Sequence, residues 1–185
     1  AHFYDKPAAL CEAYHSIGWS LTMQDMKWIM DWLLVGGVDW YVVHGYFFTT
    51  DGLKKHDAPA SPYVQMPYWP AMHQLSSYAD MCSEFSQTVD RTVKILVVDP
   101  VTSHWTENRE ITNTLSEDFA ALQRRMLEYQ LDYYIIDPQL FATATVKDGK
   151  LSIKGEEYAY VVLPPMINLE DSAFDKVKEY AESGG

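Results

Sequence analysis

The sequence has little cysteine, little positive charge and no long apolar run, and each shortage excludes a class of protein. Its two cysteines, Cys11 and Cys82, are too few for the disulfide framework of a small secreted domain. The 14 lysines and arginines are outnumbered by 26 acidic residues, and the formal net charge of -12 disfavours nucleic acid and anionic membranes as partners. No apolar run approaches the roughly 20 residues of a membrane-spanning helix. We therefore expect binding to neither nucleic acid nor membrane.

Several motifs of known chemistry are also missing. The sequence contains no G-x-G-x-x-G or G-x-x-x-x-G-K-[ST] phosphate loop, no G-x-S-x-G elbow, no H-E-x-x-H and no C-x-x-C. Glu12 and His15 form one E-x-x-H pair, whereas a di-iron site built on this motif needs two copies. We expect neither a metal nor another cofactor. The N-terminus lacks the basic and apolar regions of a signal peptide, and the compartment stays open.

The residues that are present indicate a globular α/β protein, since 48% are hydrophobic and 22% are charged. The apolar run Ala8–Cys11 predicts a strand. A helix is expected from Thr22, where Asp25 completes a capping box, to Gly36–Gly37. The β-branched and aromatic segment Val38–Phe48 predicts a strand that is covered on both faces. This order is a βαβ unit, whose crossover is right-handed.

A second α/β pattern begins near residues 90–92, so we expect domains at 1–89 and 90–185. A long proline-containing loop, 49–67, and a helix over Tyr68–Val89 complete the first. The second is expected to contain a loop over Asp99–Asn113 and a helix whose capping box starts at Thr114. Asp148-Gly149 predicts a hairpin, and Asn168 is expected to cap the last helix. The expected strands of the second domain are 93–98, 133–136, 144–147, 150–154 and 158–163.

Polar side chains follow both strands of the first βαβ unit. Glu12 stands where the first strand ends, and His44 follows the second. Because ligands bind at the carboxyl ends of strands in barrels and open α/β sheets, these residues are candidates for a site. The residues expected to line this candidate ligand site are Glu12, Tyr14, His15, Trp19, His44 and Tyr46.

Each candidate has a structural alternative. Glu12 can be a solvated carboxylate at a strand end, and His44 can satisfy a backbone group. Most of the aromatic residues are expected in the core, while Trp19 and Tyr46 stand where a ring can stack on a sugar. Trp105 is a further stacking candidate with an equally good structural interpretation.

The combined pattern resembles large bacterial glycoside hydrolases of the α-L-rhamnosidase-like and β-galactosidase-like kinds. The segments that carry the resemblance span nearly the whole chain. They are CEAYHSIGW, LTMQDMKWIMDWLLVGGVDWYVVHGYFF, PYWP-x-MHQLSSY, VKILVVDPVTSHW and EYAYVVLPPM with AESGG.

The resemblance implies the last βα units of a TIM barrel joined to a partial Rossmann/flavodoxin-like, glutamine-amidotransferase-like parallel sheet. It makes Glu12 a catalytic carboxylate, either the nucleophile or the general base, and makes His44 and Trp19 part of a sugar pocket. The partner acid is then expected on an earlier strand, in a longer parent chain, so the 185-residue chain is expected to be inactive alone. Both cysteines precede the amidotransferase-like part, and we expect no glutaminase activity from it.

A second hypothesis is a non-catalytic α/β module that binds carbohydrate or mediates assembly. Its exposed apolar surface is then expected to be buried in a partner. The expected partners are a carbohydrate and either a second copy of the chain or the rest of a parent chain.

Overall fold

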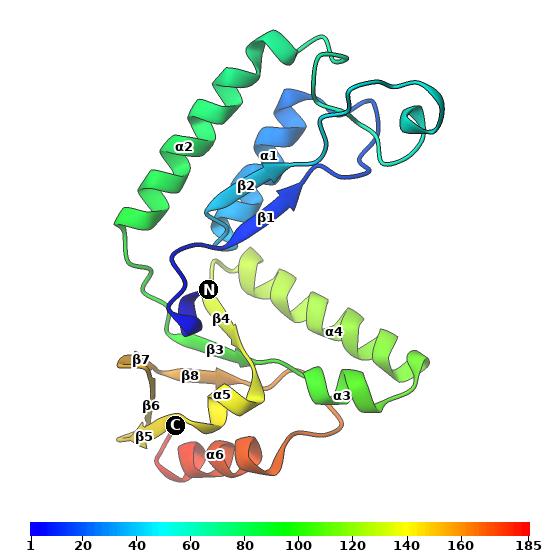
Figure 1. Cartoon of the computed structure of the whole chain (residues 1–185). Coiled ribbons are helices and arrows are strands. Elements are labelled where there is room, and N and C mark those ends of the chain that lie inside the picture. Colours follow the sequence, from blue (N-terminus) through cyan, green and yellow to red (C-terminus); the bar gives the residue numbers. More distant parts are fainter. The chain divides into compact units, whose positions relative to one another are not determined.

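The computed structural model describes residues 1–185, apart from the side chain of Lys54, and divides into two compact units. Unit 1 is Ala1–Arg91 and unit 2 is Thr92–Gly185 (Figure 1). The architecture is mixed α/β, with one parallel sheet in each unit and a small antiparallel sheet in unit 2. The sheets of the described part close no barrel. No helix among the described residues combines the length and apolarity needed to cross a membrane.

Unit 1 is built on two short parallel strands, as the strand-helix-strand pattern predicts. Strand β1 pairs with β2 in a register that places Glu12 opposite Val42. Helix α1 connects the two strands, and its predicted capping box between Thr22 and Asp25 is confirmed. The elements of unit 1 are η1 (His2–Tyr4), β1 (Leu10–Ala13), α1 (Met23–Val35), β2 (Trp40–Val43), η2 (Gly52–Lys55), η3 (Trp69–Ala71) and α2 (Met72–Thr88).

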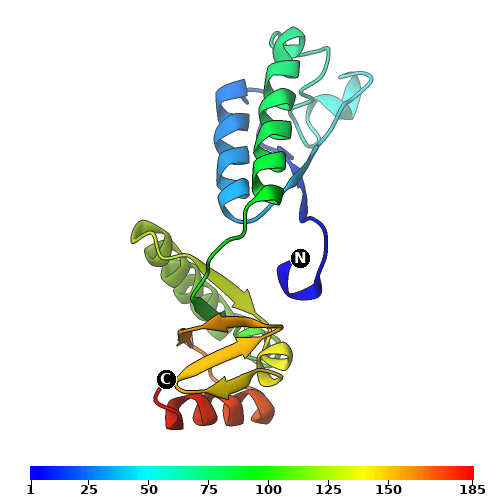
Figure 2. The ribbon, with the colours of Figure 1, turned by 90° about the vertical axis from the view of Figure 1, so that its left-hand side faces the viewer.

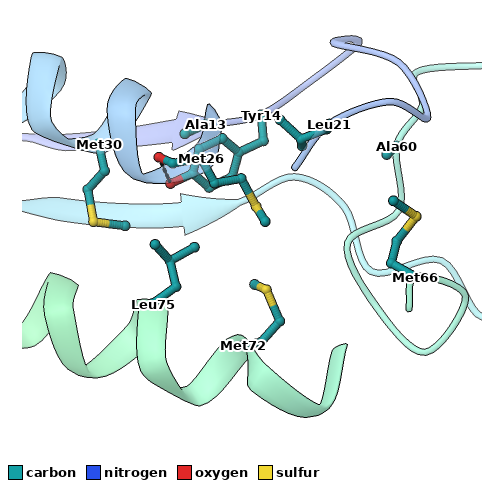
Figure 3. Close-up of a cluster of buried hydrophobic side chains, with 9 residues drawn as sticks. All are labelled: Ala13, Tyr14, Leu21, Met26, Met30, Ala60, Met66, Met72 and Leu75. Carbon is teal, nitrogen blue, oxygen red and sulfur yellow. Dashed lines mark hydrogen bonds between the residues drawn. The ribbon is translucent and has the colours of Figure 1, made fainter. Parts of the chain in front are cut away.

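The core of unit 1 lies between the strands and the helices α1 and α2, which run side by side (Figure 2). Methionines supply much of it, because their unbranched side chains fill irregular gaps between elements. Tyr41 and Val43 of β2 pack against this cluster from the sheet. Figure 3 shows the buried members, which are Ala13, Tyr14, Leu21, Met26, Met30, Ala60, Met66, Met72 and Leu75.

The opposite face of the sheet is open, and the prediction of a strand over Val38–Phe48 covered on both faces is wrong. β2 is only four residues long, and its exposure alternates along the strand. Side chains alternate between the faces of a strand, so one set packs on the helices and the other points away. We call this second set the open sheet face. It consists of Leu10 (60% exposed), Glu12, Trp40 (54%) and Val42 (45%).

Unit 2 contains three parallel strands in the order β4-β3-β8. The first strand in the sequence is central, the second lies on one side and the third on the other. Among doubly wound folds, the flavodoxin-like class begins with the same order. The elements of unit 2 are β3 (Ile95–Val98), α3 (Val101–Thr106), α4 (Arg109–Glu128), β4 (Tyr133–Ile136), α5 (Pro138–Ala142), β5 (Thr145–Lys147), β6 (Lys150–Ile153), β7 (Glu156–Tyr158), β8 (Tyr160–Val162) and α6 (Asp171–Glu182).

Some predictions for unit 2 are confirmed and others are wrong. The hairpin at Asp148-Gly149 forms, and both residues have positive φ, as its tight turn requires. The region predicted as a loop from residue 99 to 113 instead contains α3 and the start of α4. Asn108 caps α4, because its side chain accepts bonds from the N–H groups of Glu110 and Ile111. Thr114 is therefore inside the helix and not at its start.

Asn168 does not cap the last helix, which begins after Glu170 without a side-chain cap. Its side chain is used elsewhere: the Nδ2 group donates to the hydroxyl of Thr106 at 2.7 Å, and Oδ1 accepts from Ser103 at 3.0 Å. A residue type that favours capping is thus used to join α3 to the segment after β8.

Asp39 ties together the amino-terminal ends of both strands of unit 1 and the last turns of α2. Its carboxylate accepts bonds from the N–H of Ala9 at 3.1 Å and from the hydroxyl of Ser86 at 2.7 Å. The hydroxyl of Ser83 donates to its carbonyl oxygen. One half-buried residue thus fixes the position of α2 against the sheet.

Replacing Asp39 with alanine is expected to lower the free energy of unfolding of unit 1 by about 1–3 kcal/mol, because two hydrogen bonds to a charged group are lost. Urea unfolding followed by circular dichroism measures this. Asp57→Ala, at an exposed position in the long loop, is the control and should change stability little. Equal stability of the two variants would show that Asp39 does not hold α2.

Candidate functional site

The candidate site of unit 1 lies where β1 and β2 end. β1 runs two residues further than the predicted strand, so Glu12 lies inside it and not beyond it. The side chain of Glu12 is exposed on the open sheet face, beside Val42 of β2. Of the four side chains on that face, Glu12 alone is ionisable. The carboxylate is therefore free to meet a ligand approaching the sheet from the side away from the helices.

Tyr14, a predicted substrate-binding residue, is a core residue in the structure. Its backbone has a positive φ of 77°, which breaks the alternation of β1, and the ring lies among the buried residues of α1 (Figure 3). The hydroxyl donates to the carbonyl oxygen of Met26 at 3.1 Å. Burial raises the pKa of Tyr14 well above its usual value. Tyr14 thus anchors the end of β1 to the helix.

The structure brings His15 and His44 together. The centroids of their rings are 4.3 Å apart, with 54° between the ring planes. The N–H of His44 donates to the carbonyl of Ala13, which continues the pairing of the strands by one step. His44 directly follows the last residue of β2, so the two rings lie where the parallel strands end.

The two imidazoles differ in their hydrogen bonds. Nδ1 of His15 lies 2.7 Å from the hydroxyl of Ser16, while the buried Nδ1 of His44 has no hydrogen-bond partner among the described residues. The Nδ1 of His44 is shielded from solvent, whereas the ring of His15 is exposed, so His15 is the imidazole that a ligand can reach. This is the group that the site offers beside the carboxylate of Glu12.

Trp19, another predicted substrate-binding residue, anchors the long loop. Its indole Nε1 donates to the carbonyl of Lys55 at 2.8 Å, and the neighbouring Gly18 N–H donates to Pro59 at 3.0 Å. The ring also packs against the core of unit 1. Its N–H and its packing are both used within the chain, so its evident role is structural.

Tyr46 lies in an aromatic cluster that sequence reasoning missed. Its ring centroid is 5.3 Å from that of Tyr63 and 5.7 Å from that of Trp69, and Tyr63 and Trp69 meet nearly edge to face at 4.7 Å. The two partners lie in the long loop and in η3, 17 and 23 residues further on. Positions in a loop follow no periodic pattern, so no pattern in the sequence indicates that these rings meet. The available signal was the motif PYWP, which contains Trp69.

Unit 2 has its own polar groups where its parallel strands end. In doubly wound sheets this edge, at the point where the strand order reverses, is where ligands bind. Here the buried hydroxyl of Ser103 accepts bonds from the N–H groups of Ile167 and Asn168, at 3.0 and 3.1 Å, and donates to Asn168. Helix α3, which follows β3, and the loop after β8 are thus joined by hydrogen bonds within the chain. Trp105, the further stacking candidate, is exposed on α3.

No group of three or more His, Cys, Asp or Glu side chains in the described part of the chain is arranged to hold a metal ion. Comparison with protein-family models gives no match, and comparison with curated proteins gives none either. The assignment of the site therefore depends on its geometry.

Asp99, directly after β3, is expected to make the stability of unit 2 depend on pH. Burial raises the pKa of its carboxyl; His104 opposes this rise and Asp137 adds to it. The folded unit then holds a proton that the unfolded chain releases at about pH 3.9. Stability is therefore lost as the pH rises from that value through the higher pKa of the folded state.

Asp99→Asn removes this loss. The free energy of unfolding of the variant, relative to that of the unsubstituted chain, should therefore be higher at pH 7 than near pH 4. Denaturant unfolding at a series of pH values measures the difference. Asp118→Asn, at an exposed position on α4, is the control and should show a difference that is constant with pH. A constant difference for Asp99→Asn as well would contradict the prediction.

Proposed function

We propose that this chain is part of a glycoside hydrolase in which Glu12 is one of two catalytic carboxylates. In this proposal residues 1–89 are the last βα units of a TIM barrel, and residues 90–185 begin a glutamine-amidotransferase-like domain. The observation that carries it is the open sheet face. In a barrel, helices cover one face of each strand and the other face points to the interior. β1 and β2 have this asymmetry, and Glu12 is the ionisable residue on the face without helices.

Glycosidic bond hydrolysis uses two carboxylates on opposite sides of the bond. They lie about 5–5.5 Å apart in retaining enzymes and about 6.5–9.5 Å apart in inverting ones. Glu12 is then the nucleophile or the general base, and the acid comes from another strand. The paired rings of His15 and His44 stand at the same strand ends, and the exposed His15 offers a hydrogen bond to a sugar hydroxyl. The substrate class is a rhamnoside or a galactoside.

The second half of the proposal concerns unit 2. Its strand order supports a flavodoxin-like sheet. This is a broader class than the glutamine-amidotransferase-like domain that we propose. Neither cysteine of the sequence lies in unit 2, so it lacks the thiol that glutamine hydrolysis of this kind needs. We infer that it has no glutaminase activity.

The test is hydrolysis of nitrophenyl rhamnosides and galactosides by the longest polypeptide encoded by the reading frame that contains this chain. Glu12→Gln, which keeps shape but removes the charge, is expected to lower kcat by at least about 100-fold, since a catalytic carboxylate is lost. The matched control is Glu84→Gln, at an exposed position on α2. The 185-residue chain alone should release no nitrophenol. Unchanged hydrolysis by the Glu12→Gln variant, or none by the polypeptide without substitution, contradicts the proposal.

A second candidate function is assembly without catalysis, and the exposed apolar residues of the open sheet face favour it. Three neighbouring positions, Leu10, Trp40 and Val42, are apolar and between 45% and 60% exposed. Contiguous exposed apolar surface commonly marks an interaction site. In this alternative a second copy of the chain covers the face.

Light scattering after size exclusion separates the two candidates. If the face binds a second copy, the 185-residue chain is a dimer, and Trp40→Glu should convert it to a monomer by placing a charge in the interface. Trp28→Glu, at an exposed position on α1, is the control. A monomer without substitution rules out this form of assembly.

A further inference from the structure

The aromatic cluster of Tyr46, Tyr63 and Trp69 presents a ring face at the end of unit 1 where β2 stops. Tyr63 and Trp69 are half-buried and lock against each other nearly edge to face. Tyr46 packs on both and remains 50% exposed. We call this cluster the aromatic ledge. An exposed ring that contacts two others has little freedom to turn, so its exposed part keeps one direction.

The backbone that carries Tyr46 is fixed by a small hydrogen-bond network. The fully buried hydroxyl of Ser61 accepts from the N–H of Phe47 at 2.9 Å and donates to Gln65 Oε1 at 3.1 Å. Gln65 Nε2 in turn donates to the carbonyl of Phe47 at 2.7 Å. Both polar groups of the Phe47 backbone are thus held by the long loop, immediately beside Tyr46. Such fixed positioning reduces the entropy lost when a ligand binds.

We propose that the aromatic ledge stacks against a pyranose ring of the carbohydrate, with Tyr46 as the contact residue. This inference rests on the proposed function and names a subsite of it. One face of a galactoside carries several C–H groups, whose hydrogens are weakly positive and apolar. The face of an aromatic ring is apolar and weakly negative, which matches that surface.

The neighbouring Phe48 gives the experiment its control. It is 97% exposed and lies two residues from Tyr46, but outside the ledge. If any exposed ring in this segment binds sugar, Phe48 is as good a candidate as Tyr46. If the supported ring is required, only Tyr46 matters.

The experiment is saturation-transfer-difference NMR of methyl β-D-galactopyranoside and methyl α-L-rhamnopyranoside with the 185-residue chain. We expect saturation to reach mainly the protons of one face of the sugar ring. Tyr46→Ala should weaken binding about five- to tenfold, whereas Tyr46→Phe and Phe48→Ala should leave it nearly unchanged, since both keep the ring of the ledge. Circular dichroism and the thermal midpoint check that each variant is folded.

A second measurement needs no substitution at the contact residue. In the nitrogen-labelled chain, addition of the sugar should shift the indole N–H signal of Trp69, which Trp69→Phe assigns. Absence of saturation transfer for both sugars, an equal loss for Phe48→Ala, or an unmoved Trp69 signal overturns the proposal.

The experiments distinguish a wrong proposal for the aromatic ledge from a wrong proposal for the hydrolase. If Glu12→Gln abolishes hydrolysis by the longer polypeptide while Tyr46→Ala leaves sugar binding unchanged, the ledge is wrong and the hydrolase proposal stands. If the ledge binds sugar and no hydrolysis depends on Glu12, the hydrolase proposal is wrong and the ledge belongs to a binding module.

Discussion

The arrangement of unit 1 depends on the parallel pairing of β1 with β2. Parallel sheets are normally covered on both faces. Here α1 and α2 cover one face, and Leu10, Trp40 and Val42 remain exposed on the other. Full burial of such side chains contributes about 1.5–3 kcal/mol each. Further structure, a ligand or a partner that covers the open sheet face would therefore gain the free energy of burying these side chains.

The same pairing brings chemistry together. Because the strands are parallel, their carboxyl ends meet, and His15 contacts His44 although 28 residues separate them in the sequence. Tyr14 contributes by turning the other way: its ring enters the core and holds the end of β1 on α1. The loop that follows is fixed in turn by Trp19 and by Ser61. The predicted site thus divides into residues that hold the strand ends and residues that face outward.

The sequence was informative where a local rule acts alone. The capping box at Thr22 and the hairpin at Asp148-Gly149 each depend on a few adjacent residues, and both form. It failed where two local signals compete and where tertiary contacts decide. The Thr114 box was an equally good local signal, but Asn108 starts the helix earlier and Thr114 bonds back to Glu110. The partners of Tyr46 in the aromatic ledge depend on how a long loop folds back, which no periodicity records.

The division of the site also explains why single residue types were poor guides to function. Trp19 and Tyr46 both follow strands and both appeared able to stack on a sugar. The structure separates them by what each ring already contacts: Trp19 uses its N–H within the chain and packs against the core, whereas Tyr46 packs on two rings and remains 50% exposed. A binding ring needs both properties, because an unsupported ring loses entropy on binding and a covered ring has no face to offer. Support and exposure together are therefore the criterion that singles out Tyr46 among the aromatic candidates of unit 1.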